Sequence, residues 1–334
     1  MRAITVLGAG SWGTALAVHL GRVGHHVTLW ARDAGLVHEM RVRRANAVYL
    51  PDVTMPATVS VADQLSEALR GSTIVVSALP SHGCRAVVRA AAPYVEPDAV
   101  LVSATKGLES DTLLRMSEVV SEETAARYPV VVLSGPSFAI EVAGQLPTAI
   151  VAASRDLAAL EAVQAEFRGP ALRLYGSDDV VGVEIGGSMK NIIAIAAGVV
   201  EGLGLGHNAL AALITRGLAE ITRLACALGG RRETLAGLSG LGDLVLTCTG
   251  SLSRNRHVGV ELARGRPLPE ILASMKMIAE GGRTTGAALA LGSRHGVELP
   301  IATQMAEVLA GRTNVRSAIE ALMLRRQRAE AEAG

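Results

Sequence analysis

Lys190 and Asn191 stand near the start of an almost continuous apolar run, Met189–Val200. A helix built from this run has no polar face and belongs inside a core. A lysine is rarely buried without a partner, because desolvating its charge is costly. Two interpretations are open. Either the amine reaches solvent from the helix end, or a cleft wall holds it with a lowered pKa, so that it can accept and donate a proton.

A glycine motif, G-x-G-x-x-G, is formed by Gly8, Gly10 and Gly13. In a dinucleotide-binding loop these glycines permit a tight turn, let the backbone approach a pyrophosphate, and allow the following helix to pack closely. The helix then directs free N–H groups at the phosphates. Strand-like runs lie on both sides of the motif within residues 2–30. This context favours a Rossmann-type unit over an isolated glycine turn.

The residues after the second strand-like run bear on the choice of cofactor. The acidic residue that usually binds the adenosine ribose is missing there, and Ala31 and Arg32 stand in its place. Asp33 follows and fits the N-cap of a helix that begins at Ala34. Arg32 can pair with a 2′-phosphate or be an ordinary solvated arginine. The sequence therefore predicts NADP or NAD as the cofactor and leaves the preference open.

Two more groups of polar residues lie in the second half of the chain. Asp243 and Thr247 are four residues apart and share one face of a helix. Asp243 is equally suited to be an N-cap. The segment 253–255 opens another helix and could bind an anion through a guanidinium and free N–H groups. Two basic residues follow it directly, so a solvated basic turn is the other interpretation.

The elements that must position these residues alternate between strand and helix in the first half. This alternation predicts a parallel, doubly wound sheet, whose ligands bind at the carboxyl ends of the strands. Pro80, Lys106 and Ser134–Ser137 stand at such ends. The predicted strands are Arg2–Leu7, His25–Trp30, Thr58–Val61, Thr73–Leu79, Val100–Thr105, Val130–Leu133, Thr148–Ala153 and Leu172–Tyr175.

After Gly176 the pattern changes to apolar helices separated by glycines. We predict a Rossmann-type NAD(P)-binding domain at residues 1–176 and an all-α substrate-binding and catalytic domain at 177–334. The predicted helices are Asp178–Glu184 running into the Lys190 segment, Asn208–Leu228 with Asn208 as cap, Val258–Ala263, Pro269–Met275, Thr285–His295, Ile301–Ala310 and Val315–Gln327.

Composition excludes several classes of function. The net charge is +1 and aromatic residues make up 2%, which argues against nucleic-acid binding. We find no signal-like start and no long uninterrupted apolar stretch, so we expect a cytoplasmic protein without integral membrane association. Cys84, Cys226 and Cys248 are scattered, which predicts reduced thiols and no metal site.

Taken together, the motifs resemble those of bacterial NAD(P)-dependent sn-glycerol-3-phosphate dehydrogenases. This resemblance implies the reversible reduction of dihydroxyacetone phosphate to sn-glycerol 3-phosphate for glycerophospholipid synthesis, by a homodimer. The matching stretches occur in the family's order. They are Gly8–Ala17, Ala104–Leu108, Ser134–Ala139, Gly186–Asn191, Thr215–Glu220, Gly240–Thr249 and Ser253–Arg256.

The resemblance also implies a role for each matching position, with Lys190 as the proton acceptor and donor. The implied substrate-binding residues are Lys106, Gly135, Ser137, Lys190, Asp243, Ser253, Arg254 and Asn255. The implied cofactor-binding residues are Ser11, Trp12, Arg32, Tyr49, Lys106, Ala139, Arg254, Ile278 and Glu280, in addition to Gly8, Gly10 and Gly13. Tyr49 and Ile278 lie in the least sharply patterned stretches.

The residue chemistry agrees with these implied roles. Neutral Lys190 would take the C2 hydroxyl proton in oxidation, and its ammonium form would return the proton in reduction. Burial and the charge of Lys106 would lower its pKa, Asp243 would orient it, and Arg254 would hold the phosphate. Two rival functions stay open. One is another lysine-based hydroxy-acid dehydrogenase, and the other is a non-catalytic, dinucleotide-binding redox sensor.

Overall fold

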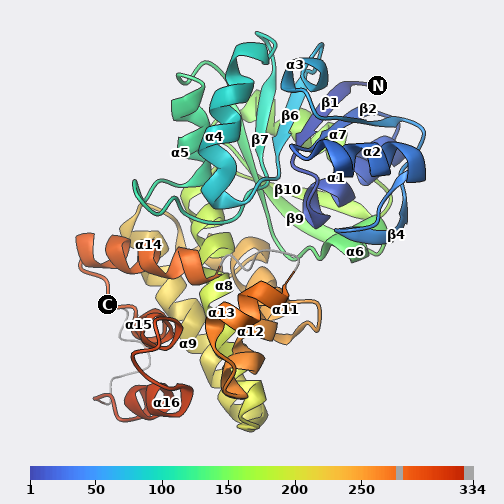
Figure 1. Cartoon of the computed structure of the whole chain (residues 1–334). Helices are drawn as coiled ribbons and strands as arrows, with labels where there is room; N and C mark the ends of the chain where they lie inside the picture. The colour runs from blue at the N-terminus through green and yellow to red at the C-terminus, as the bar shows by residue number, and fades with distance from the viewer. Residues whose placement is uncertain (276–280, 327–334) are drawn as a thin grey trace. The chain divides into compact units, whose positions relative to one another are not determined.

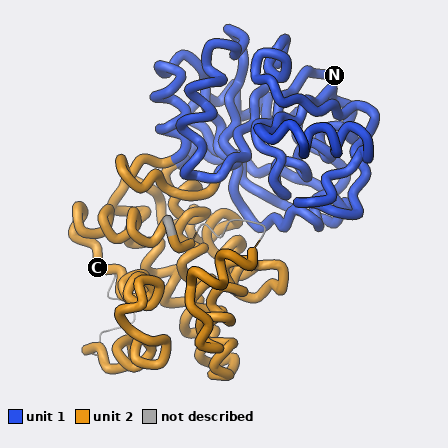
Figure 2. The backbone as a smooth tube through the Cα atoms, in the orientation of Figure 1, with its two compact units in different colours: residues 1–105, 116–180 blue, residues 106–115, 181–334 orange. Residues whose placement is uncertain are grey.

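The structure is a computed structural model that describes residues 1–275 and 281–326. The chain divides into two compact units (Figures 1 and 2). Unit 1 contains residues 1–105 and 116–180, and unit 2 contains residues 106–115 and those from 181 onward. The segment 106–115 thus belongs to unit 2 although the chain returns to unit 1 after it. No pattern in the sequence predicts this excursion. As functional domains, residues 1–176 and 177–334 remain a prediction.

Unit 1 is built on an eight-stranded sheet with the order β10-β9-β8-β7-β6-β1-β2-β5. All eight strands of this sheet were predicted, with ends that differ by at most two residues. They are β1 (Ala3–Leu7), β2 (His26–Trp30), β5 (Val59–Ala62), β6 (Ile74–Ser77), β7 (Val100–Ser103), β8 (Val130–Ser134), β9 (Thr148–Ala153) and β10 (Leu172–Ser177). A separate antiparallel pair, β3 (Ala45–Asn46) and β4 (Leu50–Thr54), was not predicted.

The direction of the strands follows the prediction only in part. The neighbours from β5 through β2, β1, β6 and β7 to β8 run parallel. Strand β9 pairs with β8 in antiparallel fashion, and β10 runs parallel to β9. The prediction of a wholly parallel sheet is therefore wrong at this edge of the sheet. Buried strands of either direction show the same apolar run, so the sequence pattern does not distinguish them.

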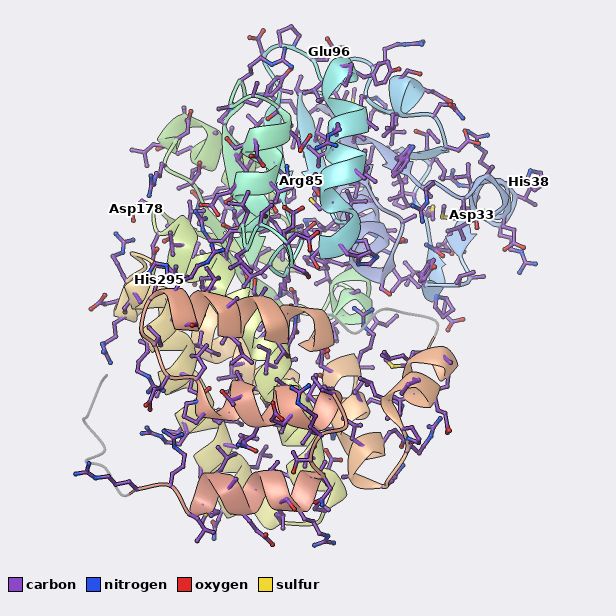
Figure 3. All side chains as sticks on the ribbon, turned by 60° about the vertical axis from the view of Figure 1, so that its left-hand side comes forward. Asp33, His38, Arg85, Glu96, Asp178 and His295 are labelled. Carbon is purple, nitrogen blue, oxygen red and sulfur yellow. The ribbon has the colours of Figure 1, made fainter. Side chains whose placement is uncertain are left out.

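The helices of unit 1 flank this sheet (Figure 1). Asp33 caps the second of them by accepting a hydrogen bond from the Leu36 N–H at 3.1 Å, as predicted (Figure 3). Arg85 joins two neighbouring helices through ion pairs of 2.7 Å and 2.5 Å with Glu122 and Glu123 (Figure 3). The helical segments are α1 (Ser11–Arg22), α2 (Ala34–Arg43), α3 (Leu65–Ala68), α4 (Ser81–Ala91), η1 (Ala92–Tyr94), α5 (Met116–Glu123), α6 (Ala139–Ala143) and α7 (Leu157–Phe167).

Unit 2 is helical in the part of the chain that the structure describes. Its central helix, α8 (Val180–Gly202), has the length and hydropathy of a membrane span, but 94% of its apolar window is buried inside the protein. The core helix of a soluble protein has this same character. The other helical segments are α9 (Gly206–Ala227), α10 (Arg232–Leu235), η2 (Leu238–Gly242), α11 (Asp243–Thr249), α12 (Arg254–Ala263), α13 (Leu268–Ser274), α14 (Gly281–Arg294), α15 (Pro300–Leu309) and α16 (Val315–Met323).

Several helix boundaries in unit 2 differ from the prediction, and α14, for example, begins at Gly281 and not at Thr285. Asn208 is not the cap of α9, because the helix already begins at Gly206 with Leu205 as its N-cap. Helix α16 ends at Met323, before the predicted end at Gln327. Periodicity alone places the ends of a helix only to within a few residues.

Candidate active site

Lys190 lies in the middle of α8 and is 7% exposed. Its Nζ donates one hydrogen bond to Asp243 Oδ1 and a second, of 3.0 Å, to Thr247 Oγ1. The prediction of a lysine that reaches solvent from a helix end is therefore wrong. The amine is held inside unit 2 by two defined acceptors.

Asp243 binds a second lysine as well. Its side chain is 0% exposed, and its Oδ2 accepts a 2.7 Å hydrogen bond from Lys106 Nζ. The interpretation of Asp243 as a helix cap is wrong, because Gly242 occupies the N-cap position of α11. The turn before α11, η2, is π-helical, a geometry that often occurs at functional sites. One buried carboxylate thus bridges two ammonium groups.

The segment 106–115 brings Lys106 into this cluster. Gly107 N–H donates to Ser188 Oγ of α8 at 3.1 Å, and Arg115 forms a 2.5 Å ion pair with Glu184 of the same helix. The apolar side chains of Leu108 and Leu113 are buried in the helical core. The strand pattern of the sequence predicted that Lys106 stands at the end of a strand. The contacts that hold it beside Asp243 were not predicted.

Thr247 is a site residue that the sequence indicated without assigning it a role. Its Oγ1 accepts from Lys190 Nζ and donates to the Asp243 backbone oxygen at 2.6 Å. Because the hydroxyl proton is used in the second bond, a lone pair of Oγ1 faces the amine. The signal was the spacing of four residues between Asp243 and Thr247, which places both on one helix face.

The surroundings of Lys190 shift its acid–base equilibrium. Burial lowers the pKa of Lys190 to about 7, the carboxylate of Asp243 opposes this shift, and the ammonium of Lys106 adds to it. Desolvation of the charged form is the dominant cause. An amine with this pKa can exchange a proton at neutral pH, which an exposed lysine cannot do.

The scarcity of lysine in the chain gives this cluster further weight. Only three of the 32 Lys and Arg residues are lysines, and they are Lys106, Lys190 and Lys276. A guanidinium stays protonated in proteins, whereas a buried ammonium readily shifts its pKa. In a chain with one other lysine and 29 arginines, two lysines on one carboxylate point to chemistry that needs a titratable amine.

The predicted anion site at 253–255 is partly engaged in contacts within unit 2. Ser253 caps α12 by accepting from Arg256 N–H at 3.3 Å. The amide of Asn255 donates to Asn191 Oδ1 at 2.9 Å and accepts from Gly281 N–H at 3.1 Å. Arg254 is exposed at the first position of the helix. The structure thus links Asn255 to the residue next to Lys190 and leaves the anion-binding role of Arg254 a prediction.

Two glycines set the distance between α12 and α8. A Cβ on Gly198 would lie 1.9 Å from the Arg256 backbone oxygen, and a Cβ on Gly259 would lie 1.9 Å from that of Ile195. Neither position can hold a side chain without displacing a helix. This close packing fixes the start of α12, and therefore Arg254, relative to the Lys190 helix.

The glycine loop of unit 1 has the geometry of a phosphate cradle. Gly8 has φ +108°, and a Cβ on Gly13 would lie 1.9 Å from the Gly8 oxygen, so the fold itself requires both glycines. A Cβ on Gly10 would meet nothing within 4 Å. Gly10 is also the N-cap of α1, whose first turn carries no acidic residue. The open space at a helix N-terminus fits the pyrophosphate of a dinucleotide.

The other predicted cofactor residues lie in varied surroundings. Trp12 packs against the core of unit 1, and its buried Nε1 has no hydrogen-bond partner among residues 1–275 and 281–326. Arg32 is exposed, so both interpretations of this residue remain. Tyr49 is partly buried, and Ala139 is the first residue of α6. Ser11 is the first residue of α1. Ile278 and Glu280 lie outside the described residues.

Gly135 and Ser137 directly follow β8, at the edge of the sheet where the parallel strands end. Gly135 has φ +134°, and a Cβ there would lie 3.0 Å from Ile150 Cα. The Ser137 hydroxyl donates to the Gly135 oxygen at 3.0 Å. Both residues therefore stand at the same edge as the glycine loop, as the strand pattern predicted.

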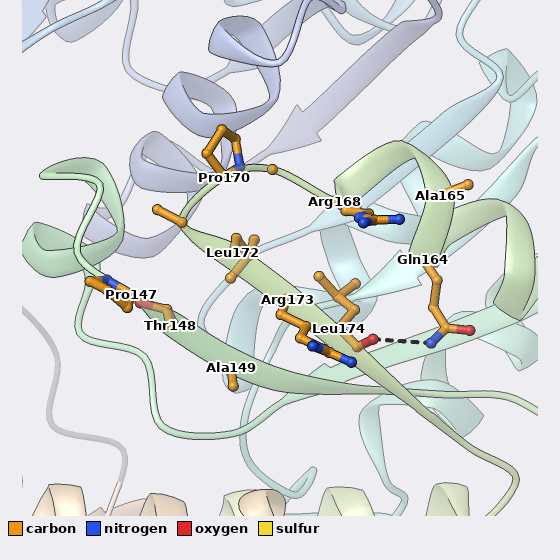
Figure 4. A pocket seen from close by; sticks show the side chains of 12 residues that line it. Pro147, Thr148, Ala149, Gln164, Ala165, Arg168, Pro170, Leu172, Arg173 and Leu174 are labelled. Carbon is orange, nitrogen blue, oxygen red and sulfur yellow. Dashed lines mark hydrogen bonds between the residues drawn. The ribbon is translucent and has the colours of Figure 1, made fainter.

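A pocket of about 710 Å³ opens elsewhere in unit 1. It lies along β9, β10 and α7, where Gln164 Nε2 donates to the Leu174 oxygen at 3.1 Å (Figure 4). None of its twelve lining residues belongs to the predicted site. This pocket is therefore separate from the buried lysines.

Comparison with known proteins identifies the family. The model of the NAD-dependent glycerol-3-phosphate dehydrogenase N-terminus matches residues 3–160, and the model of the C-terminus matches residues 179–320. Glycerol-3-phosphate dehydrogenase [NAD(P)+] of Koribacter versatilis is 54% identical over 97% of this chain and 98% of that protein. The corresponding protein of Geobacter sulfurreducens is 51% identical over 98% of both.

A solved structure agrees with this assignment. The crystal structure of glycerol-3-phosphate dehydrogenase from Coxiella burnetii is 41% identical, covers 97% of this chain and 99% of its own, and aligns with a TM-score of 0.94. Both halves of this chain are matched by the family models, and the relatives match it over almost their full length. The chain belongs to the NAD-dependent glycerol-3-phosphate dehydrogenase family.

Proposed function

We propose that the chain catalyses the reversible reduction of dihydroxyacetone phosphate to sn-glycerol 3-phosphate with NADPH or NADH. The observation that carries the proposal is the cluster of Lys106, Asp243 and Lys190, in which a buried amine with a lowered pKa is held by a carboxylate. Ketone reduction needs a proton donor at the carbonyl oxygen, and a lysine poised near neutrality can be that donor and the acceptor for the reverse reaction.

The proton steps follow from the cluster. A bound nicotinamide supplies the hydride in reduction and accepts it in oxidation. In reduction the ammonium of Lys190 donates a proton to the C2 oxygen, and Asp243 stabilises the ammonium before the transfer. In oxidation the neutral amine takes the proton from the C2 hydroxyl. Hydrogen bonds to Thr247 and Asp243 fix the orientation of Nζ. The third N–H of the ammonium would then point at the substrate oxygen.

Lys106 has two roles in this proposal. Its charge lowers the pKa of Lys190, and its own ammonium provides a second cation for the substrate and cofactor. We propose that Gly135 and Ser137 contact the substrate and that Ser253 and Asn255 hold the first turn of α12 for the phosphate. The side chain of Arg254 would then bind the phosphate through its guanidinium.

The cofactor residues also keep their predicted roles in the proposal. Gly8, Gly10, Ser11, Trp12 and Gly13 would hold the pyrophosphate side of NADP or NAD, with Arg32, Tyr49 and Ala139 around the rest. The proposal also includes a cytoplasmic homodimer whose product enters glycerophospholipid synthesis. The names of the relatives, glycerol-3-phosphate dehydrogenase [NAD(P)+], support the choice of substrate and of both cofactors.

The test of the proposed function is NADPH consumption with dihydroxyacetone phosphate and with unphosphorylated dihydroxyacetone. We expect Arg254→Gln to lower kcat/KM for the phosphorylated ketone by about 10- to 100-fold, because a charge-assisted phosphate contact is worth about 1.5–3 kcal/mol. The unphosphorylated ketone should react slowly with both proteins and show little difference between them.

Arg312→Gln is the matched control. The exposed Arg312 pairs with Glu307 on the surface of unit 2 at 2.7 Å, and its loss should leave kcat/KM unchanged. If Arg254→Gln has the wild-type kcat/KM for dihydroxyacetone phosphate, the phosphate binds elsewhere. Faster reaction with a β-keto acid would favour the rival hydroxy-acid dehydrogenase, and no turnover with any small ketone would favour a redox sensor.

A further inference from the structure

Asn46 is a fully buried polar residue of unit 1 that the proposed function leaves unused. It lies in β3 and is 0% exposed. Its Nδ2 donates to the Ala9 backbone oxygen at 2.8 Å and to Thr14 Oγ1 at 2.9 Å. Its Oδ1 accepts from Tyr49 N–H at 3.1 Å. One carboxamide therefore joins three segments.

The chemistry of these partners requires an amide. The Ala9 carbonyl only accepts, and the Tyr49 N–H only donates, so the Asn46 side chain must present a donor on one side and an acceptor on the other. A carboxylate would face the Ala9 oxygen with a second oxygen. An aliphatic side chain would leave buried donors and acceptors without partners. Asparagine satisfies both sides in one orientation.

The contact with Ala9 sets the orientation of a peptide in the glycine loop. Ala9 stands between Gly8 and Gly10, and the carbonyl of Ala9 shares its planar trans peptide with the Gly10 N–H. In such a peptide the C=O and N–H point in opposite directions. Binding of the Ala9 oxygen by Asn46 therefore directs the Gly10 N–H away from Asn46. A side-chain carbon on Gly10 would meet nothing within 4 Å, so the space around this residue is open to a ligand.

The other two bonds reach the neighbouring parts of the loop. Thr14 receives the second Asn46 donor, and its N–H bonds to the Gly10 oxygen at 2.9 Å in the first turn of α1. Tyr49, bound through its backbone, is a predicted cofactor residue. The bonds from Asn46 to Ala9 and to Thr14 span 37 and 32 residues of sequence, so they hold segments that the local chain does not hold.

We propose that Asn46 is a positioning residue for the dinucleotide loop: its carboxamide preorganises the Gly8–Gly13 turn, the start of α1 and the Tyr49 segment for the cofactor's pyrophosphate. This inference rests on dinucleotide binding as part of the proposed function. Asn46 acts through the loop and does not itself touch the cofactor. Its loss should weaken cofactor binding with little effect on the affinity for dihydroxyacetone phosphate.

The test is the Kd for NADPH of Asn46→Leu and Asn46→Asp, measured by calorimetric titration of the full chain. We expect the Kd of both variants to rise by about 10- to 100-fold, because each leaves buried groups of the loop unpaired. The KM for dihydroxyacetone phosphate at saturating NADPH should stay within about twofold of wild type, since the loop is preserved once the cofactor is bound. Asn314→Asp is the matched control, because Asn314 caps α16 and an aspartate caps a helix equally well.

The outcomes separate this inference from the proposed function. Variants that fold and bind NADPH with the wild-type Kd overturn the inference alone. An equal rise in the NADPH Kd and the KM for dihydroxyacetone phosphate would show a general structural role and also overturn it.

If neither Asn46 variant folds, Thr14→Val is the deciding test, because it removes one acceptor of Asn46 while keeping the side-chain shape. Its NADPH Kd should rise about 3- to 10-fold, and an unchanged Kd contradicts the inference. A wild-type chain that binds NADPH without reducing dihydroxyacetone phosphate contradicts only the proposed function, and one that binds no dinucleotide contradicts both.

Discussion

Lys190→Met is expected to lower kcat for the reduction of dihydroxyacetone phosphate by about 10²- to 10⁴-fold, the range that general acid–base catalysis contributes. Methionine has a side chain of similar length and packs well in a buried site, so α8 should keep its place in the core. The variant loses the amine that donates to Asp243 and Thr247. The measurement is steady-state turnover, with NADPH binding measured on the same preparation and expected to be close to wild type.

Lys190→Arg is the control that separates charge from proton transfer. Arginine keeps a cation beside Asp243, but a guanidinium does not release its proton near neutral pH. Both variants should therefore be almost inactive. Near-normal turnover of Lys190→Met would contradict the assignment of Lys190 as the proton carrier. An active Lys190→Arg enzyme would mean that Lys190 supplies charge alone.

Asp243→Asn should cause the second large loss, in both activity and stability. The change removes the carboxylate that is bonded to Lys106 and Lys190, while the two amines remain near each other. Breaking a buried ion pair in this way costs about 3–5 kcal/mol of unfolding free energy. Because Asp243 raises the pKa of Lys190, its removal lowers this pKa further. Ketone reduction, which needs the ammonium, should therefore be impaired more at pH 8 than at pH 6.

The experiment for Asp243 combines urea unfolding with turnover at these two pH values. Asp156→Asn is the matched control, because Asp156 caps α7 in unit 1 and asparagine is an equally good cap. Its stability and kcat should match those of wild type. Equal impairment of Asp243→Asn at pH 6 and pH 8 would show that Asp243 does not sustain the ammonium of Lys190.

The sequence predicted the elements of unit 1 well because their patterns are local. Most strands of the large sheet are short apolar runs, and the glycine motif runs from the end of β1 into the first turn of α1. The direction of β9 was predicted wrongly, since a buried strand has the same composition in either direction. The short pair β3 and β4 carries no clear alternation, so no pattern indicated it.

The candidate site was predictable in its residue types and much less in its contacts. Lys190 was indicated by a charge within an apolar run, and Thr247 by its spacing from Asp243. The bond between Lys106 and Asp243 joins residues 137 positions apart, and the bond between Asn46 and Ala9 joins residues 37 apart. Hydrophobic periodicity is a local property and does not predict such long-range pairs. The low number of lysines was a further signal, because a lysine can titrate near neutral pH where an arginine cannot.

The most direct test of the account is the pH dependence of kcat/KM in both directions with the wild-type chain. It should be measured above about pH 6.5, beyond the second pKa of the substrate phosphate near 6. Reduction needs the Lys190 ammonium, and oxidation needs the neutral amine. We predict that reduction falls and oxidation rises as the pH passes through about 7, the lowered pKa of Lys190. Profiles that stay flat until the ordinary lysine pKa of about 10.4 would contradict the claim that this buried amine carries the proton.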